Sequence, residues 1–320
     1  MIILENDILA IKLLPEMGGK IVSFFRKDGQ FELAAQAGKN SGLKPAQGAG
    51  FSGYAFGMDE AFPNIDAEEI MWKGRKLRYP DHGEIWSSAF QVPEQETSSA
   101  RLIWQSREFS YSYEKTLSLE GERLRIRYRI VNTGKEELPC IWTWHGLMRY
   151  EQDMEILLPE EIKHCRNVSP SRALGEVGRI YPVKNPTYDF TRVPKAETKS
   201  AVKYYGEERV EKGRCGLVYP SQKVKCIVEY DAAKLPYFGV WITAGGFQGD
   251  YNCALEPSSG FYDRISKAGE LGRLPVLSAG EEMEFDFAIA ITESITEMGR
   301  EPLEECYNPK SFDFPPNMLK

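Results

Sequence analysis

Residues 123–130 read R-L-R-I-R-Y-R-I, so that charged and apolar side chains alternate. A period of two is typical of a β-strand, because successive side chains of a strand point to opposite faces of its sheet. We therefore expect the apolar residues to face a core and the four arginines to face water. The alternation accounts for the arginines without a ligand, which favours a solvated sheet face over a binding patch.

Segments with strand character extend on both sides of this stretch. Asp28-Gly29 predicts a hairpin turn, and Glu120-Gly121-Glu122 predicts another. Further strands are expected at residues 20–27, 31–35, 109–119, 138–143, 223–230, 237–244 and 283–292. Helical periodicity is nearly absent. The pattern indicates an all-β protein, built as one large antiparallel β-sandwich.

No linker or internal repeat divides the chain, so we predict a single domain over residues 1–320. Residues 38–57 are rich in glycine, alanine and serine, and residues 171–198 contain several prolines. Both are expected to be loops. A short helix is expected within residues 294–306, in a peripheral tail that begins at about residue 293.

The composition argues against several classes of protein. The net charge is −7, without a lysine and arginine cluster, which argues against nucleic-acid binding. No run of about 18 apolar residues predicts a membrane span. The N-terminal residues lack the features of a signal peptide, so a cytoplasmic location is expected. Without an export signal or a Cys-x-x-Cys pair, free buried thiols are predicted for the six cysteines: Cys140, Cys165, Cys215, Cys226, Cys253 and Cys306.

Two of the three histidines have neighbours suited to a sugar site. His82 lies in Y-P-D-H-G-E-I-W and His145 in W-T-W-H-G-L, each followed by glycine and close to tryptophan. Glycine lets a ligand approach the backbone, and aromatic faces pack against the apolar face of a sugar ring. Either histidine alone could be structural, and His164, without such neighbours, is interpreted as structural or exposed. Three tryptophans are candidate sugar contacts: Trp86, Trp144 and Trp241.

Carboxylates supply the other candidates. Glu256 lies in N-C-A-L-E-P-S-S-G, where a strand is expected to end, so its side chain could project into a cleft. Asp59 and Glu60, in G-M-D-E-A-F-P-N, could hold sugar hydroxyls. For each of these residues, a solvent-facing charge at a turn is the alternative interpretation.

One carboxylate and one imidazole on opposite sides of a sugar suit a specific reaction. Interconverting the anomers of an aldose needs a base for the C1 hydroxyl proton and an acid for the ring oxygen. Burial and neighbouring charges can bring the pKa of both groups towards neutral pH. No metal ion or organic cofactor is expected.

In their order along the chain, these motifs resemble the aldose 1-epimerase (galactose mutarotase-like) superfamily. The shared elements are Pro-x-x-Gly-Gly at 15–19, His-Gly at 82–83, Trp-His at 144–145 and Leu-Glu-Pro at 255–257. The resemblance implies a galactose mutarotase-like fold. It also implies Glu256 as the general base at the C1 hydroxyl and His145 as the general acid at the ring oxygen. His82 is similar to the first family histidine, which helps to hold the ring-oxygen side.

The chain departs from the family at two points, and a third family position has two candidates. Glu84-Ile85-Trp86 follows the His-Gly where the family usually has an arginine. Residues 57–63 lack the Arg-Gly-Gly of sugar-phosphate relatives, which argues against a hexose 6-phosphate. The family also uses an aspartate between its second histidine and its glutamate, for which Asp231 and Asp250 are candidates.

Three functions therefore remain open, all with a small sugar as partner and with the oligomeric state undetermined. The first is a mutarotase or close relative that acts on a free neutral aldose. The second is a carbohydrate-binding protein without catalysis, because a fold does not fix a function. The third is a glycoside hydrolase or lyase, in which Asp59 or Glu60 would supply a second carboxylate near Glu256.

Overall fold

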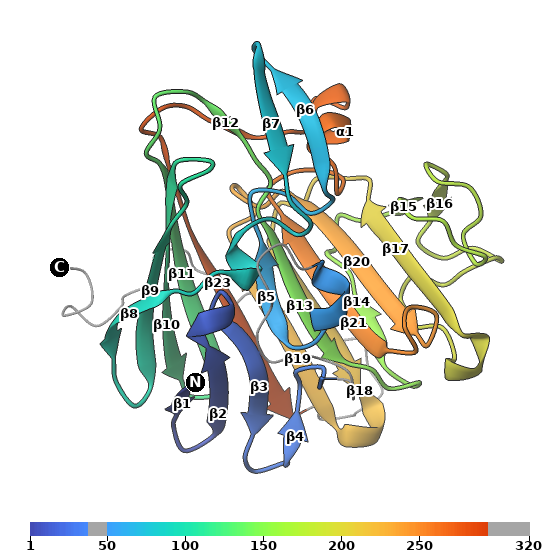
Figure 1. Ribbon diagram of the computed structural model, residues 1–320. Helices are drawn as coiled ribbons and strands as arrows, with labels where there is room; N and C mark the ends of the chain where they lie inside the picture. The colour runs from blue at the N-terminus through green and yellow to red at the C-terminus, as the bar shows by residue number, and fades with distance from the viewer. Residues whose placement is uncertain (38–49, 294–320) are drawn as a thin grey trace.

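The computed structural model describes residues 1–37 and 50–293. Two large antiparallel sheets lie against each other and enclose the main core (Figure 1). The predicted all-β class and the antiparallel sandwich are confirmed. The predictions for residues 38–49, for a helix within residues 294–306 and for Cys306 fall outside the described residues. A single domain over all 320 residues stays a prediction.

The larger sheet carries the candidate site. Its eleven strands within the described ranges are β1 (Ile2–Glu5), β2 (Leu9–Leu14), β3 (Lys20–Arg26), β4 (Phe31–Glu32), β5 (Met58–Ala61), β13 (Thr143–Arg149), β15 (His164–Asn167), β16 (Ile180–Pro182), β17 (Ser200–Gly206), β20 (Tyr237–Ala244) and β21 (Tyr251–Ser258). They lie in the order β1-β2-β3-β5-β13-β21-β20-β17-β15-β16, with β4 paired to β3. Residues from both halves of the chain therefore meet at β5, β13 and β21.

The second sheet contains the alternating stretch. Its eight strands in the described part of the chain are β8 (Gln91–Gln95), β9 (Ser99–Gln105), β10 (Tyr111–Glu120), β11 (Arg123–Asn132), β14 (Glu155–Leu157), β18 (Arg214–Tyr219), β19 (Val224–Tyr230) and β23 (Glu282–Glu293). On β11 the four apolar residues from Leu124 to Ile130 are buried, as predicted. The four arginines are not simply solvated, because each forms an ion pair with a carboxylate of a nearby residue; Arg127, for example, pairs with Asp286 on β23.

Large aromatic side chains fill the space between the two sheets. Trp144 of β13 packs on Phe287 of β23, with ring centres 4.8 Å apart, and Trp142 donates a hydrogen bond from Nε1 to the hydroxyl of Tyr113. Burial of such surface contributes roughly 25 cal/mol per Å² of apolar area. This packing fixes which face of β13 belongs to the core, and hence which face is left for a ligand.

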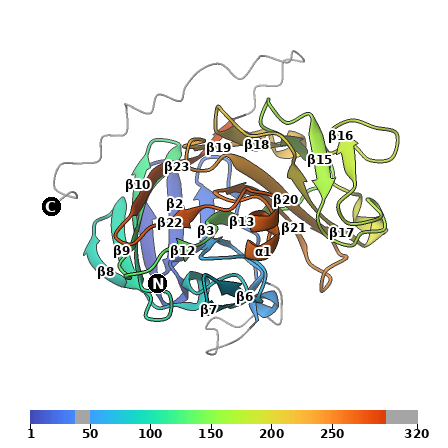
Figure 2. The same cartoon turned by 90° about the horizontal axis from the view of Figure 1, so that it is seen from above.

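Smaller elements cover one end of the sandwich. A hairpin of β6 (Glu68–Trp72) and β7 (Arg75–Tyr79) stands beside the helix α1 (Ile265–Glu270), and the main-chain nitrogen of Ser266 donates a hydrogen bond to Glu68 (Figures 1 and 2). A short ribbon pairs β12 (Leu138–Pro139) with β22 (Val276–Leu277). The 3-10 helices of the described ranges span Pro15–Met17, Phe51–Tyr54, Ile85–Ser87, Ala196–Thr198 and Pro220–Gln222.

Several sequence expectations need refinement. The strand predicted at residues 138–143 consists only of the two residues of β12, after which the chain crosses to the larger sheet and begins β13 at Thr143. The expected loop at residues 171–198 contains β16, which adds an edge strand. Five cysteines are free and buried, as predicted. None of the helices in the described ranges is long and apolar enough to cross a membrane.

Candidate active site

A cavity of about 410 Å³ lies on the face of the larger sheet that points away from the core. This volume is within the range of ordinary small-molecule sites. His145 of β13 and Lys203 of β17 form part of its wall, together with His82 from the loop after β7. The wall also includes Phe51, Asp66, Asp81, Leu147, Trp241, Asn252 and Asp263. The strands contribute the floor, and the loops contribute the sides.

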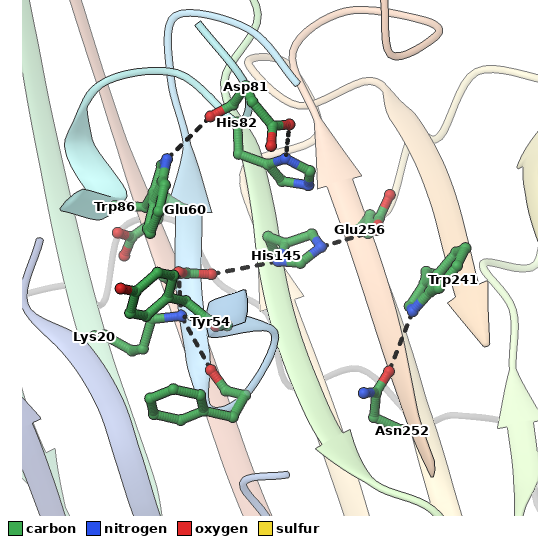
Figure 3. Close-up of polar contacts among 12 residues, drawn as sticks. Lys20, Tyr54, Glu60, Asp81, His82, Trp86, His145, Trp241, Asn252 and Glu256 are labelled. Carbon is green, nitrogen blue, oxygen red and sulfur yellow. Dashed lines mark hydrogen bonds and ion pairs between the residues drawn. The ribbon is translucent and has the colours of Figure 1, made fainter. Parts of the chain in front are cut away.

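His145 stands between two carboxylates. Its Nδ1 lies 3.3 Å from Oδ1 of Asp59 on the adjacent strand β5, where the two residues are paired in register. Its Nε2 lies 3.9 Å from Oε1 of Glu256 on β21 (Figure 3). The structure thus brings together the two residues that the sequence proposes as acid and base.

Asp59 is held by a buried lysine behind the cavity. Nζ of Lys20 lies 2.7 Å from Oδ2 of Asp59 and also donates hydrogen bonds to the carbonyl oxygens of Tyr54 and Phe56. Burial raises the pKa of Asp59, but Lys20 and His145 together bring it below its usual value. Asp59 is therefore a carboxylate that accepts the Nδ1 proton of His145 and leaves Nε2 directed at Glu256.

Glu256 is completely buried, although it lies next to the cavity. His145 and Lys203 both contact it and both line the cavity, so their side chains separate its carboxylate from the open space. Burial raises the pKa of Glu256, Lys203 opposes this rise, and Asp263 adds to it. Burial lowers the pKa of His145, against the influence of Asp59. The two pKa values therefore move towards each other, as an acid–base pair requires.

His82 reaches the cavity because of an unusual backbone. His82 and Gly83 both have positive φ, 57° and 72°, and a Cβ on Gly83 would collide with the carbonyl oxygen of Phe62 at 2.1 Å. The bend places the His82 ring against Phe51, with centres 4.1 Å apart, and 5.1 Å from the ring of His145. Oδ1 of Asp81 lies 2.7 Å from Nδ1 of His82, at hydrogen-bonding distance.

The tryptophan candidates have different positions. Trp241 lines the cavity, and its Nε1 donates a hydrogen bond to Asn252 at 3.2 Å. Trp86 is buried behind Phe51 and donates a hydrogen bond to the carbonyl oxygen of Asp81, so it supports the loop rather than facing the cavity (Figure 3). Trp144 lies in the core, on the opposite face of β13 from His145, because neighbouring residues of a strand alternate.

Glu60 also lies away from the cavity, contrary to the sequence expectation. It follows Asp59 on β5 and therefore points to the other face, where Nζ of Lys115 lies 2.8 Å from Oε2 and the hydroxyl of Tyr128 donates to Oε1. Glu60 is thus not placed to bind a sugar or to act as the second carboxylate of a hydrolase. Neither Asp231 nor Asp250 lines the cavity either, whereas Asp263 does.

Lys203 and Asp263 are two residues beside Glu256 that the sequence did not indicate. Nζ of Lys203 lies 3.1 Å from Oε2 of Glu256 and 3.0 Å from Oδ1 of Asp263, which also accepts a hydrogen bond from Tyr205. Lys203 and Tyr205 share one face of β17, but the order S-A-V-K-Y-Y-G has no strict alternation of polar and apolar residues that would mark this strand. Asp263 lies in an irregular segment after β21, where the sequence gives no such signal either.

The third histidine lies away from the cavity. His164 is exposed on β15, pairs with Glu208 and does not line the cavity. Within residues 1–37 and 50–293, no three His, Cys, Asp or Glu side chains are grouped to hold a metal ion.

Comparisons with known proteins agree with the fold. The chain is similar in structure to a galactose mutarotase related enzyme from Lactobacillus acidophilus, with a TM-score of 0.69 and 15% identity over 92% of this chain and 97% of that one. It is also similar to a galactose mutarotase-like protein from Lactobacillus casei ATCC 334, with a TM-score of 0.67 and 15% identity over 91% of this chain and 100% of that one. A galactose mutarotase-like protein from Clostridium acetobutylicum matches with a TM-score of 0.67 and 14% identity over 89% of this chain and 93% of that one. No curated protein matches the chain.

A family model described as a domain of unknown function (DUF4432) matches residues 92–291, which include β13, β17 and β21. This match covers more than half of the chain. The solved structures, at these low identities, show the fold. The protein therefore has the galactose mutarotase-like fold, and it belongs to the family described as a domain of unknown function (DUF4432).

Proposed function

We propose that this protein interconverts the anomers of a free neutral aldose, with Glu256 and His145 as the acid–base pair. The observation that carries the proposal is the 3.9 Å contact between Oε1 of Glu256 and Nε2 of His145 at the wall of a sugar-sized cavity. The names of the solved structures with this fold, galactose mutarotase related or galactose mutarotase-like, support the same reaction class.

The reaction needs one proton removed and one supplied. Glu256 takes the proton of the C1 hydroxyl while His145 gives a proton to the ring oxygen, and the bond between C1 and the ring oxygen breaks. The open-chain aldehyde rotates about the bond between C1 and C2, and the ring closes on the other face with the two roles reversed. Positioned groups of this kind accelerate proton transfer by about 10² to 10⁴.

The substrate must open a path to Glu256, because the carboxylate has no exposed surface. The covering side chains are His145 and Lys203, so a shift of one of them brings the carboxylate within reach of a hydroxyl. Hydrogen bonds in catalytic sites commonly tighten only when substrate is bound.

The charges of the cavity support a neutral sugar. Among the described residues, Asp66, Asp81 and Asp263 contribute carboxyl groups to its wall, and Lys203 contributes the ammonium group. A phosphate or carboxylate on the sugar would meet these groups at close range and would be repelled. The aromatic ring of Trp241 in the same wall suits the apolar face of a sugar ring.

Sugar binding without catalysis is the second candidate. The complete burial of Glu256 favours it, because a base that stays covered cannot take a proton from the ligand. The same cavity would then serve as a receptor site for a neutral sugar.

Anomer exchange measured by NMR or polarimetry tests the proposal. Fresh α-glucose, α-galactose and a panel of other neutral aldoses are followed with the wild type, Glu256→Gln and Glu229→Gln. Glu229 is a matched control, because it is a buried glutamate paired with Arg123 in the second sheet. We expect acceleration that Glu256→Gln abolishes and Glu229→Gln retains. Binding of a sugar without any acceleration would establish the second candidate, and full activity in Glu256→Gln would refute the base assignment.

A further inference from the structure

Lys203 reaches Glu256 across an intervening strand. Lys203 lies on β17 and Glu256 on β21, with β20 between them. Gly239 of β20 is paired with Glu256 on one side and with Tyr205 on the other. A Cβ at Gly239 would meet Oε2 of Glu256 and Cζ of Tyr205, each at 3.1 Å. Because Gly239 has no side chain, the carboxylate of Glu256 has room beside Lys203.

The two oxygens of Glu256 have different neighbours. Oε2 lies 3.1 Å from Nζ of Lys203, whereas Oε1 faces Nε2 of His145. Neither oxygen accepts a hydrogen bond of good geometry from any described residue. Burying a carboxylate without such hydrogen bonds lowers the stability of the fold, and the ammonium group of Lys203 offsets part of this loss.

Charged and titratable groups approach Glu256 from several elements. They are Lys203 and Tyr205 on β17, His145 on β13, Asp263 in the segment after β21, and His82 in the loop after β7. Lys203 is the permanent cation in this set. Burial lowers the pKa of Lys203, but Asp263 and Glu256 raise it above its usual value, so the amine stays protonated and is unsuited to forming a Schiff base with the sugar aldehyde.

We propose that Lys203 is a positioning residue for Glu256: it fixes Oε2, keeps the carboxylate charged, and leaves Oε1 as the atom that exchanges protons with the substrate. Asp263 completes the arrangement, because it accepts from both Lys203 and Tyr205 and so fixes the ammonium group. The chemical role of Oε1 rests on the proposed function, whereas the effect of Lys203 on the charge of Glu256 does not.

The test compares Lys203→Met and Lys203→Arg with a matched control, Lys115→Met. Lys115 is also a buried lysine paired with a glutamate, but it lies on β10 of the second sheet and reaches Glu60 across the core. Protein labelled with ¹³C at the glutamate carboxyl groups is titrated by NMR, and the Glu256 signal is identified by its loss in Glu256→Gln. Thermal unfolding is recorded for each variant, and titrations are made below the melting temperature.

We expect the Glu256 titration to move up by about 1 to 3 pH units in Lys203→Met, the shift typical of losing a nearby opposite charge. Lys203→Arg should keep the titration close to the wild type, and Lys115→Met should leave it unchanged. In the activity assay, the pH below which kcat/KM falls should rise in Lys203→Met by the same amount as the Glu256 titration. In that variant kcat should fall by a larger factor than KM changes.

The outcomes separate this inference from the proposed function. An unchanged Glu256 titration in folded Lys203→Met, or an equal shift in Lys115→Met, overturns the inference. A shifted titration in a protein that accelerates no aldose supports the charge effect of Lys203 and refutes the proposed reaction. If Lys203→Met does not fold, Lys203→Gln is titrated in its place, with the same expected direction.

Discussion

Two buried lysine–glutamate pairs lie on opposite faces of the larger sheet. Lys115 and Glu60 face the core, whereas Lys203 and Glu256 face the cavity. Glu60 receives hydrogen bonds from Lys115 to both oxygens, at 3.0 and 2.8 Å, and a third from Tyr128 at 2.6 Å. Glu256 has an ion pair with Lys203, but its oxygens accept no well-formed hydrogen bond from the described residues.

Burial serves a different purpose in each pair. Glu60 accepts three hydrogen bonds from protein groups and faces the core rather than the cavity, so its pair with Lys115 acts on stability. A carboxylate with unused lone pairs beside a cavity retains the capacity to take a proton. Burial raises the pKa of both glutamates. Hydrogen-bond satisfaction, rather than the direction of the pKa shift, distinguishes the structural pair from the candidate catalytic pair.

The largest expected effect is on stability and comes from the core pair. Glu60→Gln leaves the Lys115 ammonium buried without its carboxylate, so the free energy of unfolding should fall by about 3 to 5 kcal/mol. Glu256→Gln should cost less, because Lys203 keeps Asp263 as a partner. Denaturant titration measures both. Equal losses in the two variants would contradict the distinction between the pairs.

The next effect is on catalysis and comes from the cavity side. His145→Asn should lower the rate of anomer exchange by about 100-fold or more, because it removes one of the two proton-transfer groups. His164→Asn is the control, since His164 is an exposed histidine paired with Glu208. A similar loss of activity in both variants would show that the assay reports general damage rather than the site.

A smaller effect is expected when the space beside Glu256 is filled. Gly239→Ala should lower kcat by about tenfold, because the new methyl group displaces the carboxylate by tenths of an ångström and reaction rates respond to such misplacement. Gly269→Ala is the control, because its Cβ would make only an ordinary contact with Leu274 at 3.6 Å. Normal kinetics in Gly239→Ala would show that the position of Glu256 is not critical.

The smallest effect is a pH dependence. The base form of Glu256 must be ionised and its pKa is raised by burial, so kcat/KM should fall as pH decreases through a value above 4.5. The contribution of Glu256 to the free energy of unfolding has the opposite pH dependence. A raised pKa means that the folded state binds the proton more tightly, so this stabilisation is greatest below pH 4.5 and is lost as pH rises through the folded pKa. Thermal unfolding of wild type and Glu256→Gln against pH measures the second effect, and parallel curves for the two proteins would contradict it.

The sequence predicts the sandwich better than it predicts the site. The period of two at residues 123–130 identifies a core strand, because a long central strand with one buried face shows its geometry directly. Glu256, His145, His82, Asp59 and Trp241 are all in or beside the cavity. Glu60 follows Asp59 and Trp144 precedes His145 on a strand, so each side chain points to the opposite face from its neighbour beside the cavity.

Lys203 and Asp263 could not be found in the same way. Their importance depends on strand order, since β17 reaches β21 only across β20, and β18 and β19 of the second sheet lie between β17 and β20 in the chain. Long-range strand pairing leaves little trace in local sequence, whereas alternation and turn residues are local features.

The four-residue strand β5 is held in register from both of its faces. Asp59 binds Lys20 and His145 on one side, and Glu60 binds Lys115 and Tyr128 on the other. A shift of one residue would send every side chain to the opposite face. It would place the longer acid against the histidine and the shorter one in the core, and all four of these contacts would be lost together. The different lengths of the two adjacent acidic side chains thus specify the register of β5. An insertion or deletion within Met58–Ala61 would therefore abolish both the assembly of the site and the packing of the core beside it.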